Sequence, residues 1–494
     1  MLKDVTNNSR IVLTAFALTA ILQVWMVSSS DYLDSDDWFV VEMGRMVSEA
    51  PSVSHFTRFW SNEPTWRPVL TLRSAIEYSI FADHPLSRVV VNVVLHTVCA
   101  WLLMLCVARL LNDRAVGVAT AFLFLIHPLH AESLAWFHSG FEGITITVFI
   151  LLTLWLFIQE RAPWIVLAAF QAALLTRENA LCVPLLIMLI AWLQSSDISR
   201  RLHHCFRVSL PYWGLLFANL IVRIALLKSQ EHEYSSLHLV EDPLIAVFTA
   251  MAHPWLPIHP ALSGRIAWLL AFVALALCLL LLQRKRSYGV MGGAFLAFLL
   301  CSLPFIPHFH VAHRFIEALP GGHEQRWYFF HLPLAALMIW PAWLFVHWAR
   351  EHAFAKVAFG LLVILFMTAQ FQNMSWWMDR SETATQVGQK LSETLDEQTP
   401  IGLFLSEGSD DANIADQVFL NYKRRYPHSP VRVFHVVENA RDGHNGPAEA
   451  QKPATGHWHW VAGRTAPAMT RWWRWHDSTR ILESEAPKTG SGPL

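Results

Sequence analysis

The sequence predicts a polytopic α-helical membrane protein with about eleven transmembrane helices and a small extracytoplasmic α/β domain at its C-terminus. The chain has 494 residues, of which 54% are hydrophobic and only 15% are charged. Soluble globular proteins carry about 25% charged residues. Apolar stretches close to the roughly 20 residues that a helix needs to cross a bilayer recur along most of the chain. Composition and pattern therefore agree on the fold class.

Eleven apolar stretches are candidate spans. They lie at 11–28, 89–109, 115–129, 143–158, 162–176, 179–194, 208–228, 266–282, 288–306, 330–348 and 356–372. The third and fifth stretches are short for a crossing. The first follows Lys3 and Arg10, but it lacks a small-residue cleavage site and further spans follow it. We therefore expect an uncleaved helix.

Basic residues recur in alternate connections between these stretches. They are Arg109 with Arg114, Arg161, the run at 200–207, the QRKR run at 283–286, and the segment 350–356. Cytoplasmic loops carry an excess of Lys and Arg, so we expect these connections in the cytoplasm. The long segments, from 30–88 to the tail, then face the opposite side. The lack of cysteines in them favours a bacterial inner membrane with this side in the periplasm, and an endoplasmic reticulum with this side in the lumen is the alternative.

The predicted domains are a membrane domain at 1–372, with its first outer loop at 30–88, a linker helix at 373–397, and the small domain at 398–494. In the last of these, IGLFLSEG, DDANIADQVFLNYKRRY, VRVFHVV and WHWVAG indicate strand, helix, strand and strand. Its tryptophans, at 458–460 and 472–475, either stack on sugars or pack the domain core, and we favour packing.

Charge and cysteine content narrow the function further. The 37 Lys and Arg residues balance 38 Asp and Glu residues, so no basic excess suggests a nucleic-acid partner. The six cysteines form no CxxC pair and lie in or beside apolar stretches, which argues against a disulfide framework or a thiolate metal site.

Ionisable side chains gather at the predicted outer ends of the helices. They are Asp36 and Asp37 in DYLDSDDWF, Arg67 in the same loop, Arg73 and Glu77 on an expected interfacial helix, His127, His130 and Glu132 in the second outer loop, Arg177 and Glu178 between two apolar runs, and Arg326 before the tenth stretch. Carboxylates at a bilayer boundary are costly unless they have partners or a task. The plain interpretation of the aspartates is a loop start or a helix N-terminus.

One reaction would use this set of residues. Outside the cytoplasm, a glycosyl donor is typically a sugar attached to a polyprenyl phosphate. A carboxylate can remove the proton of an acceptor hydroxyl as general base. Arginines can hold the departing phosphate. Phosphate is already a good leaving group, so no general acid is required. A secondary transporter or lipid flippase is the alternative from another class.

Several blocks of the sequence resemble a known family. They are the pair Asp36-Asp37, WRPVLTLRSAIEYSIF (66–81) followed by HPLSRVVVNVVLH (84–96), FLIHPLHAESLAWFHSG (124–140), LLTRENALCVP (174–184) and HEQRWYFFHLP (323–333). In this order they resemble the class C (GT-C fold) glycosyltransferases, and in particular the membrane part of the transmembrane and tetratricopeptide-repeat-containing O-mannosyltransferase-like proteins. Phe141, Glu142 and Arg177 depart from that pattern, where the family tends to have Arg, Asp and Lys, and the family's repeats are absent.

The resemblance implies an inverting transferase that moves a sugar, commonly mannose, from a polyprenyl-phosphate carrier to an acceptor hydroxyl on a protein Ser or Thr, a glycolipid or an envelope polymer. It implies Asp36 as catalytic base, with Asp37 its close rival. Binding of the donor and its phosphate is expected from Arg67, Arg177, Glu178 and Arg326, and His127, His130 and Glu132 are expected on the sugar side. The site either holds a divalent cation on its carboxylates and histidines or is free of ions, with the histidines as hydrogen-bond donors.

Overall fold

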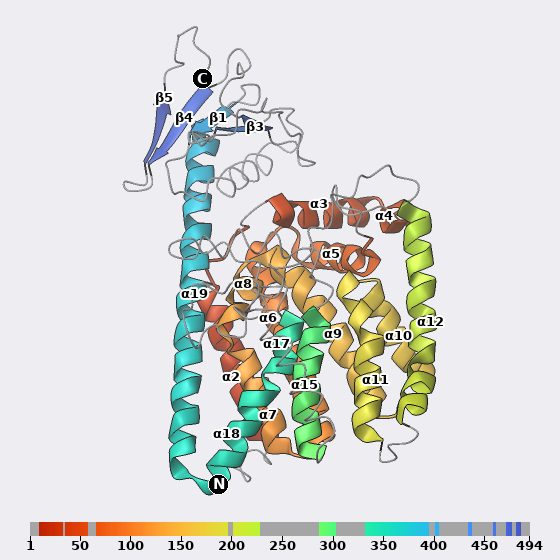
Figure 1. Ribbon diagram of the computed structural model, residues 1–494. Helices are drawn as coiled ribbons and strands as arrows, with labels where there is room; N and C mark the ends of the chain where they lie inside the picture. The colour runs from red at the N-terminus through yellow and green to blue at the C-terminus, as the bar shows by residue number, and fades with distance from the viewer. Residues whose placement is uncertain are drawn as a thin grey trace, which may run out of the picture.

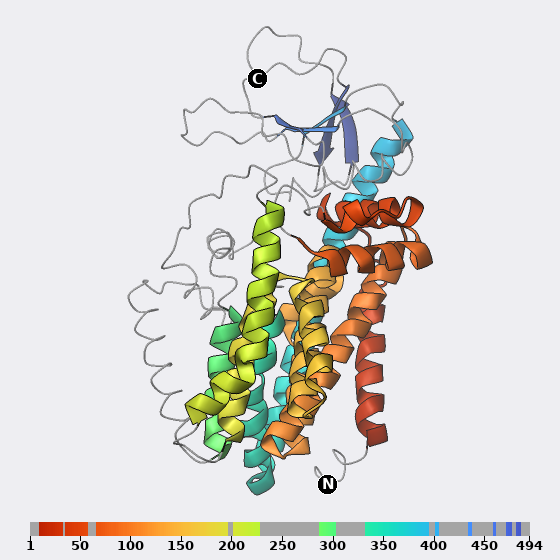
Figure 2. The ribbon, with the colours of Figure 1, turned by 90° about the vertical axis from the view of Figure 1, so that its right-hand side faces the viewer.

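The computed structural model describes residues 9–32, 35–57, 66–195, 201–227, 286–302 and 331–394, together with five short strands beyond residue 400. Long helices run side by side as a bundle, two helices lie across one end of it, and a sheet lies beyond that end (Figures 1 and 2). The ends of many bundle helices therefore lie beneath the two crossing helices, which cap the bundle.

The bundle is built from eleven helices of the described chain. They are α2 (Ser9–Met26), α6 (Pro85–Leu111), α7 (Arg114–Leu125), α9 (Phe137–Ile158), α10 (Pro163–Leu174), α11 (Val183–Gln194), α12 (Arg201–Leu227), α15 (Arg286–Ser302), α17 (His331–Leu337), α18 (Ile339–Glu351) and α19 (Ala353–Thr394). Among the described residues, six spans, one of them formed by α17 with α18, are long and apolar enough to cross a bilayer. A bent seventh joins α7 to Pro128–Ala135 at an angle of 48°. The protein is an integral, multi-pass membrane protein.

The predicted stretches agree with these helices. Every stretch except 266–282 overlaps a described helix. The stretch 266–282 lies outside the described residues, so the count of eleven spans stays a prediction. The two stretches expected to be short are α7 and α10, with 12 residues each. Both end early, at Leu125 and Leu174, and irregular turns follow them within the bundle. These turns carry several of the predicted site residues.

Local sequence explains how α6 turns into α7. Asn112 ends α6 in the left-handed conformation, with φ 53°, which Asn tolerates better than most residues. The Asp113 side chain then accepts hydrogen bonds from the amides of Ala115 and Val116 and caps α7. Arg350 of α18 pairs with the same carboxylate at 2.8 Å. The corner therefore joins three helices at the end of the bundle opposite the cap.

The cap consists of α3 (Ser35–Glu49), α4 (Val53–Thr57) and α5 (Pro68–Phe81), with α3 and α5 lying across the bundle end (Figure 1). The interfacial helix expected around Arg73 and Glu77 is α5. Proline at its start suits the first turn, where the missing amide has no intrahelical partner. The backbones of α3 and α5 approach closely, because a Cβ on Gly44 would lie 2.5 Å from the carbonyl oxygen of Ser74.

The last helix, α19, continues from the bundle toward the sheet. It runs without a break for 42 residues, so the final span and the expected linker form one helix. The strands are β1 (Ile401–Phe404), β2 (Val433–Val436), β3 (Trp458–Trp460), β4 (Arg471–His476) and β5 (Ile481–Glu485), in the order β3-β2-β1-β4-β5. Among these five described strands, β1 to β4 are parallel and β5 is antiparallel to β4.

Strands occur in all three segments where the sequence predicts them, and one tryptophan cluster forms β4. The segment DDANIADQVFLNYKRRY lies outside the described residues, so the α/β character of the tail stays a prediction. The sheet lies at the bundle end that carries α3 (Figure 2). This agrees with the expectation that the first outer loop and the tail lie on the same side of the membrane.

Gly140 provides a test of the packing beneath the cap. A Cβ at this position of α9 would lie 2.0 Å from the carbonyl oxygen of Ser133 and 2.4 Å from Asn92 Nδ2. We expect Gly140→Ala to destabilise the protein by about 1–3 kcal/mol through overpacking. Gly360→Ala on α19 is the control, because nothing lies within 4 Å of its new methyl group. Thermal unfolding in detergent measures both, and equal midpoints for the two variants would contradict the close approach.

Candidate functional site

An alternating chain of arginines and glutamates lies beneath the cap. The Glu142 carboxylate pairs with Arg67 and, at 3.0 Å, with Nη1 of Arg177. Arg67 Nη2 reaches Oε2 of Glu178 at 3.5 Å, and the other oxygen of Glu178 lies 2.6 Å from Nη1 of Arg223. The order of charges is therefore Arg177, Glu142, Arg67, Glu178 and Arg223, which we call the Arg-Glu chain.

Each member of the Arg-Glu chain lies near a helix end. Arg67 directly precedes Pro68 and α5, and Glu142 occupies the second turn of α9. Arg177 and Glu178 occupy the break between α10 and α11, where the 3-10 turn η2 (Glu178–Cys182) replaces regular helix. Arg223 lies one turn before the end of α12 and donates to the carbonyl of Leu174 at the end of α10. Four segments therefore meet at one point.

The Arg-Glu chain carries more positive than negative charge. It contains three guanidinium groups and two carboxylates, and the side chains of Arg67, Arg177 and Arg223 are only 7–12% exposed. Ionic interactions are stronger at such buried positions than in water. The planar guanidinium group suits a phosphate, so the three arginines make this a candidate place for an anion.

Asp37 is connected to the Arg-Glu chain by His138, which lies in the first turn of α9. Its side chain is fully buried, and Oδ1 accepts a hydrogen bond of 2.7 Å from the amide of His138. First-turn amides have no partner within their own helix, and the positive end of the helix dipole stabilises a carboxylate. Nε2 of His138 in turn lies 3.7 Å from Glu142. The structure thus joins Asp37 to the predicted arginines.

The other aspartate is only partly described. The backbone of Asp36 belongs to the first turn of α3, and its side chain lies outside the described part of the structure. Arg326, the remaining arginine of the predicted set, also lies outside the described residues. The roles of Asp36 and Arg326 stay predictions.

A second buried network connects α5 to α6 and α9. Arg73 donates to Glu77 at 2.7 Å and to Asn92 Oδ1 at 2.6 Å, and it also donates to Thr145. The fully buried Arg88 lies 3.5 Å from the other oxygen of Glu77. Burial lowers the pKa of Arg73 from its ordinary value, whereas Glu77 acts in the opposite direction. This network holds α5, and therefore Arg67 at its start, against the bundle.

The predicted sugar-side residues form a separate group. His127, His130 and Glu132 occupy the turn after α7, in η1 (Pro128–His130) and α8 (Ala131–Ala135), and all three are buried. His127 packs on Phe366 of α19, with ring centroids 5.0 Å apart. His130 lies beside His96 and His331, with centroid distances of 4.7 and 4.5 Å. Their contact with a sugar stays a prediction.

Four residues of these clusters have no role predicted from the sequence: Glu142, His96, His331 and Arg223. Glu142 belongs to the charged second outer loop and departs from the family pattern, and His96 and His331 lie within the blocks that resemble the family. Arg223 gave a usable signal, since an arginine inside the apolar run 208–228 is costly unless it is paired.

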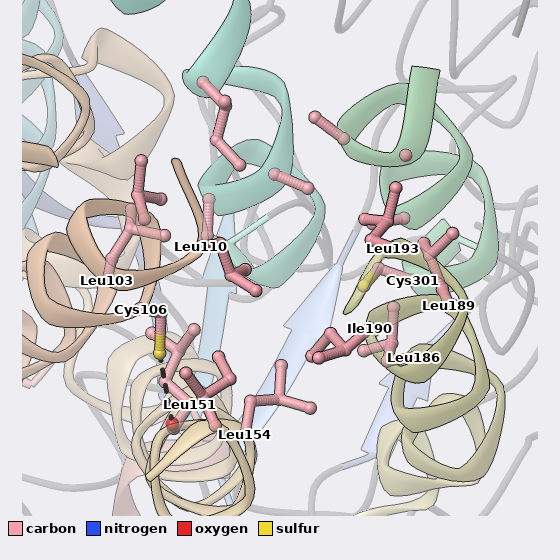
Figure 3. Close-up of a pocket in the computed structure, with 18 of the residues that line it drawn as sticks. Leu103, Cys106, Leu110, Leu151, Leu154, Leu186, Leu189, Ile190, Leu193 and Cys301 are labelled. Carbon is pink, nitrogen blue, oxygen red and sulfur yellow. Dashed lines mark hydrogen bonds between the residues drawn. The ribbon is translucent and has the colours of Figure 1, made fainter. Parts of the chain in front are cut away.

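An apolar cavity of about 100 Å³ lies inside the bundle. Leucine, isoleucine, valine, alanine and cysteine side chains of α6, α9, α11 and α15 line most of it, and residues of α17 and α18 complete it (Figure 3). Cys106, Leu151, Ile190 and Cys301 are among the residues labelled in the close-up. Its lining suits a hydrocarbon occupant.

Glu142 provides a test of the Arg-Glu chain. Glu142→Gln removes the charge that separates Arg67 from Arg177, so we expect the free energy of unfolding to fall by about 3–5 kcal/mol, as for other broken buried ion pairs. Glu42→Gln is the control, because Glu42 pairs with Arg45 at the surface, where a pair contributes about 0–1 kcal/mol. Denaturant unfolding in detergent measures the difference, and similar losses in both variants would refute the buried pairing.

Comparisons with known proteins agree with the sequence blocks. No family model matches the chain. The protein O-mannosyl-transferase Tmtc1 of Drosophila melanogaster is 26% identical to it over 296 residues, which is 58% of this chain. This chain covers only 27% of the length of that protein.

Solved structures give weaker likenesses. ArnT from Cupriavidus metallidurans, bound to undecaprenyl phosphate, has a TM-score of 0.41 and 11% identity, with 86% of each chain covered. The apo oligosaccharyltransferase of Archaeoglobus fulgidus has a TM-score of 0.38 and 13% identity, covering 90% of this chain and 62% of that one. The sequence match to Tmtc1 confirms the resemblance inferred above, namely that this chain is similar in sequence to an O-mannosyltransferase.

Proposed function

We propose that the protein is an inverting GT-C glycosyltransferase that moves a sugar from a polyprenyl-phosphate carrier to an acceptor hydroxyl. The Arg-Glu chain next to Asp37 is the observation that carries this proposal, because it combines an excess of buried guanidinium groups with a carboxylate at one end of a membrane bundle. The similarity to an O-mannosyltransferase supports the same chemistry.

The arginines are the phosphate-binding part of the proposed site. Arg67 and Arg177 share Glu142 and are therefore held side by side, and Arg223 lies at the far end of the Arg-Glu chain. As the bond between the sugar and the phosphate breaks, negative charge develops on the leaving phosphate. Guanidinium groups already positioned by glutamates stabilise that charge without having to reorganise.

Asp37 is the proposed general base, with Asp36 as the alternative. Its hydrogen bond from the His138 amide orients the carboxylate. In the proposed reaction, Asp37 accepts the hydroxyl proton while the acceptor oxygen attacks C1 on the face opposite the phosphate. The C1–O bond to the phosphate breaks as the new glycosidic bond forms, so the anomeric configuration inverts.

The proposed donor is a lipid that spans polar and apolar surroundings. Its phosphate and sugar would lie at the Arg-Glu chain, with His127, His130 and Glu132 on the sugar side. The apolar cavity in Figure 3, of about 100 Å³, would accept only a short part of its isoprenoid chain. Mannose on a protein Ser or Thr follows from the similarity to Tmtc1, and a glycolipid or envelope-polymer acceptor is the alternative. The proposed location is a bacterial inner membrane, with the site facing the periplasm.

The transporter alternative has less support from the described residues. Transporters typically bind their substrates near the bilayer midplane on discontinuous helices. The members of the Arg-Glu chain instead lie beneath the cap formed by α3 and α5, toward one end of the bundle.

Asp37→Asn tests the catalytic assignment. The asparagine oxygen can still accept from the His138 amide, so we expect normal folding but a loss of transfer of about 10²–10⁴-fold, the usual contribution of a general base. Purified protein would receive radiolabelled polyprenyl-phosphate sugars, with the product identified by mass. Glu49→Gln on the exposed face of α3 is the control. Near wild-type turnover in both Asp37→Asn and Asp36→Asn would show that the acidic loop is not the base.

The orientation can be tested separately. Because α3 and the sheet lie at the same end of the bundle, a reporter fused to the C-terminus reports the side of the membrane on which the site lies. In bacterial cells, we expect alkaline phosphatase to be active there and a cytoplasmic reporter to be inactive. The reverse pattern would place the Arg-Glu chain in the cytoplasm, where a polyprenyl-phosphate donor is not required.

A further inference from the structure

We infer that His96, His130 and His331 form a binding site for a divalent transition metal ion. The three imidazoles come from α6, η1 and the start of α17, and all are buried. One ring nitrogen of each lies within 4.8 Å of the corresponding nitrogens of the other two. This inference does not depend on the proposed transferase activity.

Hydrogen bonds to the outer sides of two rings determine where their protons lie. Nε2 of His96 lies 3.1 Å from the carbonyl oxygen of Leu125, which can only accept, so this nitrogen carries the proton. Nδ1 of His331 lies 3.0 Å from Oγ1 of Thr147. The Thr147 hydroxyl donates its own proton to the carbonyl of Gly143, so it accepts from His331.

Consequently, each ring directs a nitrogen lone pair toward the other ring. Nδ1 of His96 and Nε2 of His331 are the unprotonated nitrogens of neutral imidazoles, and they lie 2.9 Å apart. Two acceptors at this distance repel each other unless a cation lies between or beside them. A metal ion satisfies both lone pairs at once, and outer hydrogen bonds of this kind are typical of metal-binding histidines.

His130 supplies the third ligand. Its ring lies 4.5 Å from that of His331 and 4.7 Å from that of His96, measured between centroids. Its Nε2 is buried and has no hydrogen-bond partner among the described residues. An unsatisfied buried nitrogen is costly, which a metal ion would relieve.

The surroundings also suit a cation. The carbonyl of Leu125 at the end of α7 lies beside His96, and the C-terminal end of a helix carries partial negative charge. The ring of Phe124 packs against all three imidazoles, with centroid distances of 4.5–5.1 Å, and shields one side from water. Three neutral imidazoles suit Zn²⁺, Co²⁺ or Ni²⁺, whereas Mg²⁺ and Ca²⁺ prefer oxygen ligands.

Metal content tests the site directly. Full-length protein purified in detergent, stripped with a chelator and then dialysed against Zn²⁺, should retain about one ion per chain. His130→Gln and His331→Gln should lose it, whereas His204→Ala, which removes an exposed histidine of α12, should retain it. Zn²⁺ should also raise the unfolding midpoint of the stripped wild-type protein, because it binds only the folded state.

A variant that removes only the hydrogen bond behind one histidine distinguishes metal binding from simple packing. Thr147→Val removes the acceptor that holds the His331 proton, and we expect Zn²⁺ affinity to fall by about 10–100-fold. Thr120→Val is the matched control, since Thr120 is equally buried and makes the same hydrogen bond to a carbonyl four residues earlier, but contacts no histidine of the cluster by any described hydrogen bond. Its affinity should not change.

Two results would overturn the inference. Wild-type protein that retains no Zn²⁺, and whose midpoint is unchanged by Zn²⁺, would show that a proton or a neutral hydrogen bond joins His96 to His331. Equal affinities in Thr147→Val and Thr120→Val would show that the bound ion lies elsewhere. Both readouts are independent of sugar transfer, so a failure of the transferase proposal would leave them unaffected.

Discussion

The pairing of Glu142 with two arginines is the constraint on which the described site depends. A charged carboxylate inside an apolar helix bundle is tolerated only when opposite charges satisfy it. Glu142 belongs to α9, whereas Arg67 precedes α5 and Arg177 lies between α10 and α11. Burying this one group therefore requires the cap and two separate parts of the bundle to meet at one point.

The same requirement explains the short helices. Because α10 ends at Leu174, the irregular turn after it can direct the buried Arg177 to Glu142 and place Glu178 between Arg67 and Arg223. The turn after α7 does the same for His130. Non-helical backbone within a membrane domain is tolerated where protein surrounds it, and here it presents the polar side chains.

Two polar clusters of different chemistry result. The Arg-Glu chain carries excess positive charge and suits an anion, whereas the three histidines present lone pairs and suit a cation. Both draw on segments that pack against α9: Glu142 is on it, and Thr147, five residues later, holds His331. One helix thus orients both clusters, and the buried Arg73 network fixes the cap above them.

The sequence alone determined the membrane class, the positions of the apolar helices, the interfacial helix with Arg73 and the likeness to O-mannosyltransferases, because each follows from local composition, spacing or motif. It also indicated that Arg67, Arg177 and Glu178 share one side. Only the tertiary structure decided the partners. Arg67 and Glu142 are 75 residues apart, and His96 and His331 are 235 apart. No local pattern encodes such contacts, since they arise when distant helix ends must satisfy each other's buried charges and lone pairs.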